Sequence, residues 1–166
     1  MSEPCKPIAV VQGASSPEIQ ALFRRFVASL RPATRVAGVV EDCAAEQLRS
    51  LVDDRVFPLF QDLGPSSTAC SLDSESLTLA CEAVRRDVVA GCDLVVLSKF
   101  GKLEAERAGL AAAFVAAVET QTPILTSLAP KFDAEWRAFA APLFVMLPPE
   151  EAAIRRWWRE AAALAA

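Results

Sequence analysis

Apolar residues recur in two patterns along the chain. Short unbroken apolar runs that end at a turn residue or a polar side chain are typical of strands buried on both faces of a sheet. We predict such strands at residues 8–12, 36–40, 56–61, 94–97, 124–128 and 143–147. Pro58 lies in the third run, and because proline donates no backbone hydrogen bond, we expect that strand at a sheet edge.

Between these runs, apolar residues follow the three- and four-residue spacing of amphipathic helices. Ser16 as N-cap and Pro17 at the first helical position favour the start of the first helix, and Pro32 ends it. Helices are predicted at residues 17–30, 74–90, 109–120, 132–140 and 150–164. Residues 41–54 are ambiguous, with a short helix at 44–52 as one interpretation, and residues 62–71 are predicted to be a polar loop.

Alternation of strands and helices predicts right-handed crossovers and a mostly parallel sheet. We therefore expect one domain over residues 1–166, a three-layer α/β fold with about five to six strands flanked by helices. A chain of 166 residues buries roughly two-thirds of its unfolded surface. Residues 1–7, with two prolines and no apolar segment, are predicted to be flexible.

Composition narrows the classes of function. With 53% hydrophobic and 23% charged residues, general disorder is excluded. The net charge of −4 argues against a broad nucleic-acid or anionic-membrane surface. No apolar run reaches the roughly 20 residues of a membrane span, and the N-terminus does not read as a signal peptide, so a cytoplasmic location is predicted. The five cysteines, an odd number without CxxC, indicate free thiols.

The chain contains no histidine. Imidazole general bases, histidine-dependent catalytic triads and histidine metal sites are therefore excluded, and we expect no tightly bound metal.

Candidate chemistry lies where the predicted strands end, since ligands of open parallel sheets bind beyond the carboxyl ends of the strands. We predict that the polar residues there converge on one rim and bind a small anion. They are Gly13, Ala14, Ser15 and Ser16 after the first strand, Gln61, Asp62, Gly64, Ser67 and Cys70 after the edge strand, and Ser98, Lys99, Gly101, Lys102 and Glu104 after the central strand.

The first of these segments has the position of a phosphate-binding loop, where free backbone N–H groups and a helix dipole favour an anion. A Walker A loop needs Gly, Lys and Ser or Thr at the positions held here by Glu18, Ile19 and Gln20. The phosphate-binding lysine and the magnesium-binding hydroxyl are thus both absent. A plain strand-to-helix turn with a serine cap is the alternative interpretation.

Two motifs carry a family resemblance. Residues 93–106 read DLVVLSKFGKLEAE, and residues 61–73 hold Gln61, Asp62, Leu63, Gly64, Cys70, Leu72 and Asp73. Together they resemble a bacterial family of unknown function with the motifs NKFGKxEAE and QDLGxxxxxCxLD, a likeness that extends over residues 8–147. Ser98 replaces the usual Asn, and Arg107 stands where Gly is common.

The resemblance implies a context in molybdate transport and molybdenum metabolism. The family is in turn similar to thermophile-type P-loop nucleoside-triphosphatases with the motif DEIGKME. On that motif Ser98 takes the place of the magnesium-organising aspartate and Lys99 that of the catalytic glutamate. Gly101, Lys102 and Glu104 match as they stand. The resemblance thus implies a degenerate P-loop-like domain.

Loss of both carboxylates and of the Walker lysine predicts binding without hydrolysis, because phosphoryl transfer needs metal and lysine to neutralise developing charge. The expected partner is a small anion, a nucleotide or an oxyanion such as molybdate, with Lys99 as a point charge. In the alternative interpretation, Lys99 and Lys102 are solvated loop residues paired with Glu104 and Glu106. Two alternatives stay open. One is a residual nucleoside triphosphatase that uses Asp62 or Glu104, and the other is a protein-interaction module without a ligand.

Two further side-chain groups have more than one interpretation. Cys70 is either a loop-packing residue or a thiol made reactive by Lys99. Trp157 and Trp158 point to different faces of the last predicted helix, so at most one packs fully inward. The other is either further cover for the sheet or an anchor for a protein partner or for self-association.

Overall fold

A seven-stranded sheet forms the centre of the protein in the computed structural model, which describes residues 3–62 and 70–165, with the side chains of residues 61–72 left out. Its order is β4-β3-β2-β7-β8-β1-β9, and β2, β7, β8, β1 and β9 are mutually parallel. The strands of this sheet are β1 (Ile8–Val11), β2 (Val36–Asp42), β3 (Gln47–Ser50), β4 (Val56–Pro58), β7 (Leu94–Val96), β8 (Ile124–Ser127) and β9 (Phe144–Leu147). A separate two-stranded ribbon pairs β5 (Phe60–Asp62) with β6 (Cys70–Leu72).

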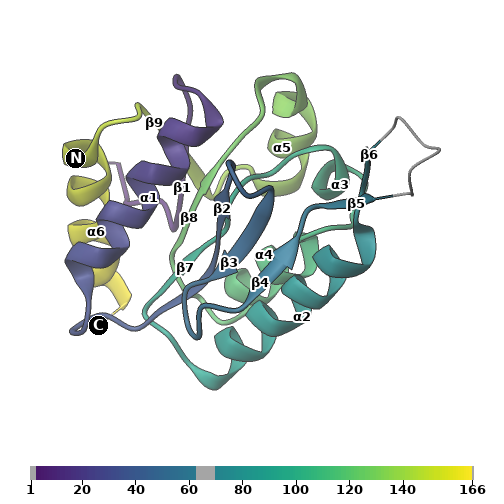
Figure 1. Cartoon of the computed structure of the whole chain (residues 1–166). Coiled ribbons are helices and arrows are strands. Elements are labelled where there is room, and N and C mark those ends of the chain that lie inside the picture. Colours follow the sequence, from purple (N-terminus) through teal and green to yellow (C-terminus); the bar gives the residue numbers. More distant parts are fainter. Residues whose placement is uncertain (1–2, 63–69, 166) are drawn as a thin grey trace.

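Helices cover both faces of the sheet, which gives three layers (Figure 1). The helices are α1 (Ser16–Leu30), α2 (Ser74–Ala90), α3 (Lys102–Ala105), α4 (Ala111–Glu119), the 3-10 turn η1 (Pro130–Phe132), α5 (Asp133–Ala140) and α6 (Glu151–Ala165). On one face, Phe23 of α1 and Ile154 of α6 pack against the sheet. On the other, Val84 of α2, Phe114 of α4 and Trp136 of α5 join the second core. The α/β three-layer prediction is confirmed.

Helix α1 forms largely as its pattern predicts. Ile19, Phe23 and Phe26 are buried on one face. The N-cap is Ser15, one residue earlier than expected, and its hydroxyl accepts a hydrogen bond from the Glu18 N–H at 3.4 Å. Pro17 lies in the first turn, where its missing N–H costs nothing.

The ambiguous segment 41–54 is a strand region and not a helix. Residues 47–50 form β3, antiparallel to β2, with Leu48 and Ser50 buried and Gln47 and Arg49 half-buried between them. This period of two is the signature of a strand. The helix at 44–52 was therefore a wrong interpretation, because pairing with β2 outweighs the helix propensity of Ala44 and Ala45.

The predicted strand 56–61 is divided in two. Its first part, β4, is the edge strand of the main sheet, as Pro58 indicates. Its second part, β5, leaves the sheet to pair with β6 in the ribbon. The predicted polar loop at 62–71 therefore carries strand residues at both of its ends.

Strands β8 and β1 are neighbours whose connections leave on opposite faces of the sheet. The chain after β1 enters α1 on one face, whereas the chain after β8 leads to Trp136 of α5 on the other. Such a reversal creates a crevice at the carboxyl ends of parallel strands. The Gln12 amide donates across it to the Leu128 carbonyl at 3.4 Å.

The last helix covers the β1–β9 end of the sheet (Figure 1). Trp157 is buried, and its indole N–H donates to the Lys6 carbonyl at 2.8 Å, whereas Trp158 is half-buried. One tryptophan thus packs inward, as the predicted helix faces require. No helix within residues 3–62 and 70–165 has the length and apolarity that crossing a bilayer demands.

Candidate functional site

The Ser98 carbonyl, just beyond β7, is the point at which three strand ends are tied together. It accepts hydrogen bonds from the Gln20 amide at 2.8 Å and from the Ser127 hydroxyl at 2.7 Å. The Gln20 carbonyl oxygen in turn accepts from the Glu41 N–H at 2.8 Å. One fully buried glutamine of α1 therefore joins the carboxyl ends of β2 and β7, and Ser127 adds β8.

The carboxylate of Glu41 lies at the centre of the rim. Its Oε2 accepts a hydrogen bond from the Ser16 hydroxyl at 3.2 Å and one from the Cys43 thiol at 3.5 Å. Lys99 Nζ lies 4.0 Å from the same oxygen. The Arg24 guanidinium donates to the Glu41 carbonyl at 2.9 Å and fixes the end of β2. The ammonium of Lys99 and the Ser16 hydroxyl in the first turn of α1 therefore both lie near one acidic oxygen of Glu41.

The Lys99–Glu41 contact is a weak ion pair. The Lys99 side chain is 46% exposed, and at 4.0 Å such a pair contributes between about 0 and 1 kcal/mol. Ser16 lies in the first turn of a helix that favours negative charge. The rim is thus mixed in charge, because Glu41 lies beside Lys99.

Glu104 braces the turn after β7. It is buried, its Oε1 accepts from the Gly101 N–H at 2.9 Å and its Oε2 accepts from the Leu110 N–H at 2.9 Å. Burial raises the pKa of Glu104, although these two hydrogen bonds oppose the shift. With both oxygens engaged by backbone N–H groups, this carboxylate positions α3 and the start of α4.

The turn between β1 and α1 is short. Only Gln12 to Ser15 separate the strand from the helix, and the Pro149 ring lies 3.3 Å from the position that a Cβ on Gly13 would occupy. The backbone groups of Gly13 and Ala14 therefore run close to the segment after β9.

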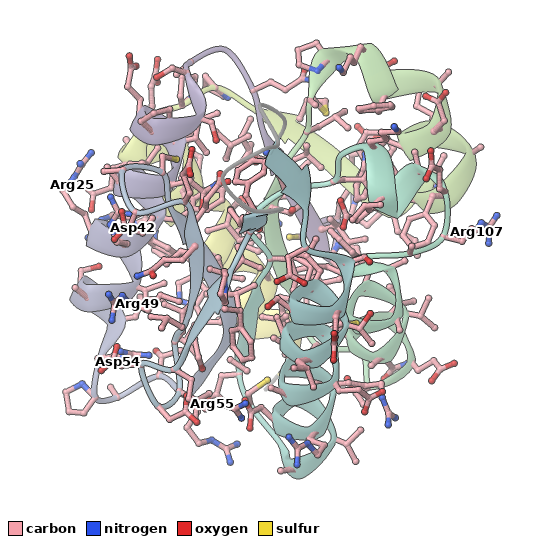
Figure 2. All side chains as sticks on the ribbon, turned by 45° about the vertical axis from the view of Figure 1, so that its right-hand side comes forward. Arg25, Asp42, Arg49, Asp54, Arg55 and Arg107 are labelled. Carbon is pink, nitrogen blue, oxygen red and sulfur yellow. The ribbon has the colours of Figure 1, made fainter. Side chains whose placement is uncertain are left out.

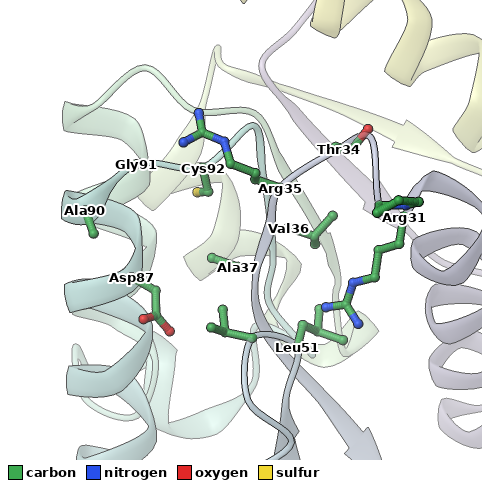
Figure 3. A pocket seen from close by; sticks show the side chains of 12 residues that line it. Arg31, Thr34, Arg35, Val36, Ala37, Leu51, Asp87, Ala90, Gly91 and Cys92 are labelled. Carbon is green, nitrogen blue, oxygen red and sulfur yellow. The ribbon is translucent and has the colours of Figure 1, made fainter.

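Two of the cavities among the described residues differ in character and in their place on the sheet. The first, of about 170 Å³, is lined by Glu41, Lys99 and Lys102 at the rim and continues between β3, α2 and α4. The second, of about 430 Å³, lies at the opposite end of the sheet beside Arg31, Arg35, Asp87 and Cys92 (Figure 3). The carboxyl-end rule favours the first as the candidate site.

Comparison with known proteins assigns the chain to a family. Residues 8–157 match the model of the family described as protein of unknown function DUF2478. The chain belongs to this family. A curated relative, the molybdenum import ATP-binding protein ModC 2 of Bradyrhizobium diazoefficiens, is 28% identical over 162 residues, which cover 92% of this chain and 18% of that protein. This similarity is consistent with a P-loop relationship, and no solved structure matches.

The rim of this DUF2478 domain brings together part of the predicted set. The Ser16 hydroxyl and the Lys99 ammonium both lie beside Oε2 of Glu41. The same cavity as Lys99 is lined by Ser98, Gly101, Lys102 and Glu104. Gln61, Asp62 and Cys70 belong to the β5–β6 ribbon, and their side chains are outside the described atoms. Gly64 and Ser67 lie outside the described residues. Their roles, and that of Cys70 as a reactive thiol, stay predictions.

Glu41 and Gln20 help to organise the rim and were not in the predicted set. Glu41 directly follows the predicted strand 36–40, so the carboxyl-end rule applied to that strand also indicates it. Gln20 stands at the position of the Walker hydroxyl. The sequence showed only that this hydroxyl is absent, and it did not indicate that Gln20 would join two strand ends.

Cys43 completes the rim of the DUF2478 domain as an unreactive thiol. Burial, followed by the nearby Glu41 carboxylate, raises the pKa of Cys43. A raised pKa keeps the sulfur protonated, as a weak hydrogen-bond donor to Glu41.

Arg107, the departure from the resembling motif, adopts φ +66°, a conformation that favours glycine. Its side chain projects into solvent, away from the remainder of the molecule (Figure 2). On the opposite side, Arg25, Asp42, Arg49 and Asp54 mix both signs of charge along α1, the β2–β3 hairpin and the β3–β4 connection (Figure 2).

Proposed function

We propose that this DUF2478 domain binds a small anion, a nucleotide or an oxyanion such as molybdate, without hydrolysing it, and serves molybdenum homeostasis. The observation that carries the proposal is the environment of Glu41 Oε2. That oxygen lies 3.2 Å from the Ser16 hydroxyl, 3.5 Å from the Cys43 thiol and 4.0 Å from Lys99 Nζ. The rim therefore already accommodates one anionic oxygen, in a position that an oxygen of a ligand would take when Glu41 turns aside.

Binding without hydrolysis follows from the groups that replaced the catalytic ones. The side chain at the Walker hydroxyl position, Gln20, is fully buried, and its amide is used by Glu41 N–H and Ser98 C=O. Glu104 has both oxygens engaged by backbone N–H groups. These donors do not fit Mg²⁺, which is held through a hydroxyl and carboxylates in P-loop enzymes, and we derive no hydrolytic step.

The molybdenum context rests on the relative named as a molybdenum import ATP-binding protein. Because the matching region is 18% of that protein, the import activity of the whole protein is not carried over. We propose that the domain acts as a ligand-sensing partner of such a system.

Titration calorimetry with phosphate, sulfate, molybdate, tungstate and AMP tests the proposal. We expect binding of at least one anion, weakened about tenfold or more in Lys99→Met, since one charge contact is lost. The matched control is Lys6→Met, at the amino end of β1, where the anion affinity is expected to stay unchanged. Absence of binding for all five anions, or equal affinity in Lys99→Met, contradicts the proposal.

A further inference from the structure

The 170 Å³ cavity at the rim is an apolar slot with charged groups at its mouth. Its walls come from four separate parts of the chain, and six hydrocarbon side chains line it. They are Leu48, Leu59, Phe60, Leu77, Leu103 and Leu110. Lys99 and Glu41 of the proposed anion site line the same cavity, together with Lys102, whereas Ser16 and Cys43 are not among its lining residues. The slot and the anion site therefore meet at Lys99 and Glu41.

The volume and apolar lining of the slot fit a ring of a ligand. Ligand pockets that enclose a whole drug-sized molecule measure about 300–1,000 Å³, so 170 Å³ accommodates only a ring portion of a ligand. Phe60 is 41% exposed, although it is a large apolar side chain lining the slot. An exposed phenyl face is a stacking surface for a nucleobase, because every base has a flat aromatic face that can stack on it.

The anionic end of the ligand is limited in size. The turn from Gln12 to Ser15 is short, Pro149 packs against Gly13, and Glu41 takes up one side of the space beside Ser16. A chain of three phosphates would place additional negative charge against the Glu41 carboxylate, whereas a single phosphate needs only Ser16 and Lys99.

We infer that the ligand of this rim is a nucleoside monophosphate, with its phosphate at Ser16 and Lys99 and its base in the slot against Phe60. The inference rests on the proposed function, because it assigns a ligand class to the same anion site. A bare oxyanion such as molybdate leaves the apolar slot empty and is expected to bind more weakly, since the burial of apolar ring surface is then lost.

The test compares AMP with inorganic phosphate by titration calorimetry on the full chain. We expect AMP to bind at least about tenfold more tightly than phosphate. Phe60→Ala removes the stacking face, and because Phe60 is partly exposed its loss does not empty the core. Leu103→Trp, at a half-buried position, fills the slot. Both are expected to reduce the AMP affinity to the phosphate level and to leave the phosphate affinity unchanged.

Leu79→Ala is the matched control, an apolar truncation at an exposed position of α2 outside the slot. It is expected to change neither affinity. Equal affinities of AMP and phosphate in the unaltered protein, with phosphate bound, overturn the inference and leave the proposed function standing. A tenfold AMP preference that survives both Phe60→Ala and Leu103→Trp places the base elsewhere and also overturns it. If the unaltered protein binds neither phosphate nor AMP, the proposed function and the inference are both overturned.

Discussion

Lys99 Nζ lies 4.0 Å from Glu41 Oε2, across the boundary between the adjacent strands β7 and β2. The two residues are 58 positions apart in the sequence and meet only because these strands pair in parallel. The Glu41 side chain is 12% exposed and the Lys99 side chain 46% exposed, so the lysine is the member more open to a ligand. An incoming anion therefore competes with an acid that belongs to the protein.

The first prediction concerns this competition. Glu41→Gln removes the negative charge and keeps a side chain of the same length, so phosphate and AMP are expected to bind about three- to tenfold more tightly. Calorimetric titration of both variants at low salt measures the change. Glu119→Gln, at the end of α4, makes the same charge change away from the rim and is expected to leave the affinities as they were. Weaker binding in Glu41→Gln would show that the carboxylate orients the ligand and does not compete with it.

The second prediction concerns Glu104 and pH. Burial raises the pKa of Glu104 in the folded protein above its ordinary value of 4.5. At a pH between 4.5 and the raised pKa, the folded protein therefore keeps a proton on Glu104 that the unfolded chain has released. The contribution of this group to stability is thus fully present below pH 4.5 and is lost as the pH rises through the raised pKa. Urea unfolding between pH 4 and 8 measures this slope.

Glu104→Gln removes the titration, and its free energy of unfolding is expected to lack that component of the slope. Its amide nitrogen cannot accept from the second buried N–H group as the ionised carboxylate does, which is expected to cost about 1–3 kcal/mol relative to the ionised parent. Glu106→Gln, an exposed neighbour, serves as control. A slope that is the same in all three proteins contradicts the assignment to Glu104.

The third prediction separates backbone strain from close packing. Gly38 and Gly91 both have positive φ, at +122° and +111°. A Cβ on Gly38 would lie 1.8 Å from the Val96 carbonyl oxygen, whereas a Cβ on Gly91 meets only the end of the Arg35 side chain at 3.7 Å. Gly91→Ala is expected to cost about 1–2 kcal/mol in strain alone.

Gly38→Ala is expected to cost well above that amount or to prevent folding, because β2 must move away from β7. Thermal unfolding followed by circular dichroism measures both variants. Similar melting temperatures for the two would mean that the β2–β7 approach relaxes at little cost.

The fourth prediction concerns hydrolysis. Phosphate release from ATP or GTP, with or without Mg²⁺, is expected to stay at the spontaneous rate, because the catalytic positions hold Gln20, Ser98 and Lys99. A sensitive phosphate-release assay over a series of protein concentrations checks this. Metal-dependent release that rises with protein concentration and disappears in Glu104→Gln would instead support the residual nucleoside triphosphatase.

Local patterns predicted the layers of the fold well but not the antiparallel edge. The face of α1 with Phe23 and the buried runs of β1 and β7 are specified by contiguous residues. In contrast, β3 is four residues long, and only its pairing with β2 distinguishes it from a helical turn. Strand identity there depends on a neighbour, and propensity alone is a weak guide.

The site shows the same division between local and long-range information. Placement of Ser16 and Lys99 at the rim follows from their positions after predicted strands. The acid beside Lys99 depends on which strand lies next to β7, and strand order is a property of the whole fold. Prediction of the apolar slot needed still more long-range information, because Leu48, Leu77 and Leu110 come from three parts of the chain that lie far apart in the sequence.

The hydrogen bond from the Trp157 indole to the Lys6 carbonyl has a consequence for larger proteins that contain such a domain. It fastens the segment that enters β1 to the middle of α6, and the end of α6 lies beside Pro7 and Pro123, at the amino ends of β1 and β8. The end of α6 thus lies on the side of the molecule remote from Ser16 and Lys99, whereas Glu3 and Pro4 run beside Leu147 and Pro148 at the carboxyl end of β9. A further domain joined after α6 would keep the ligand entrance unobstructed, so this fold can be joined to others at that end without rebuilding the rim.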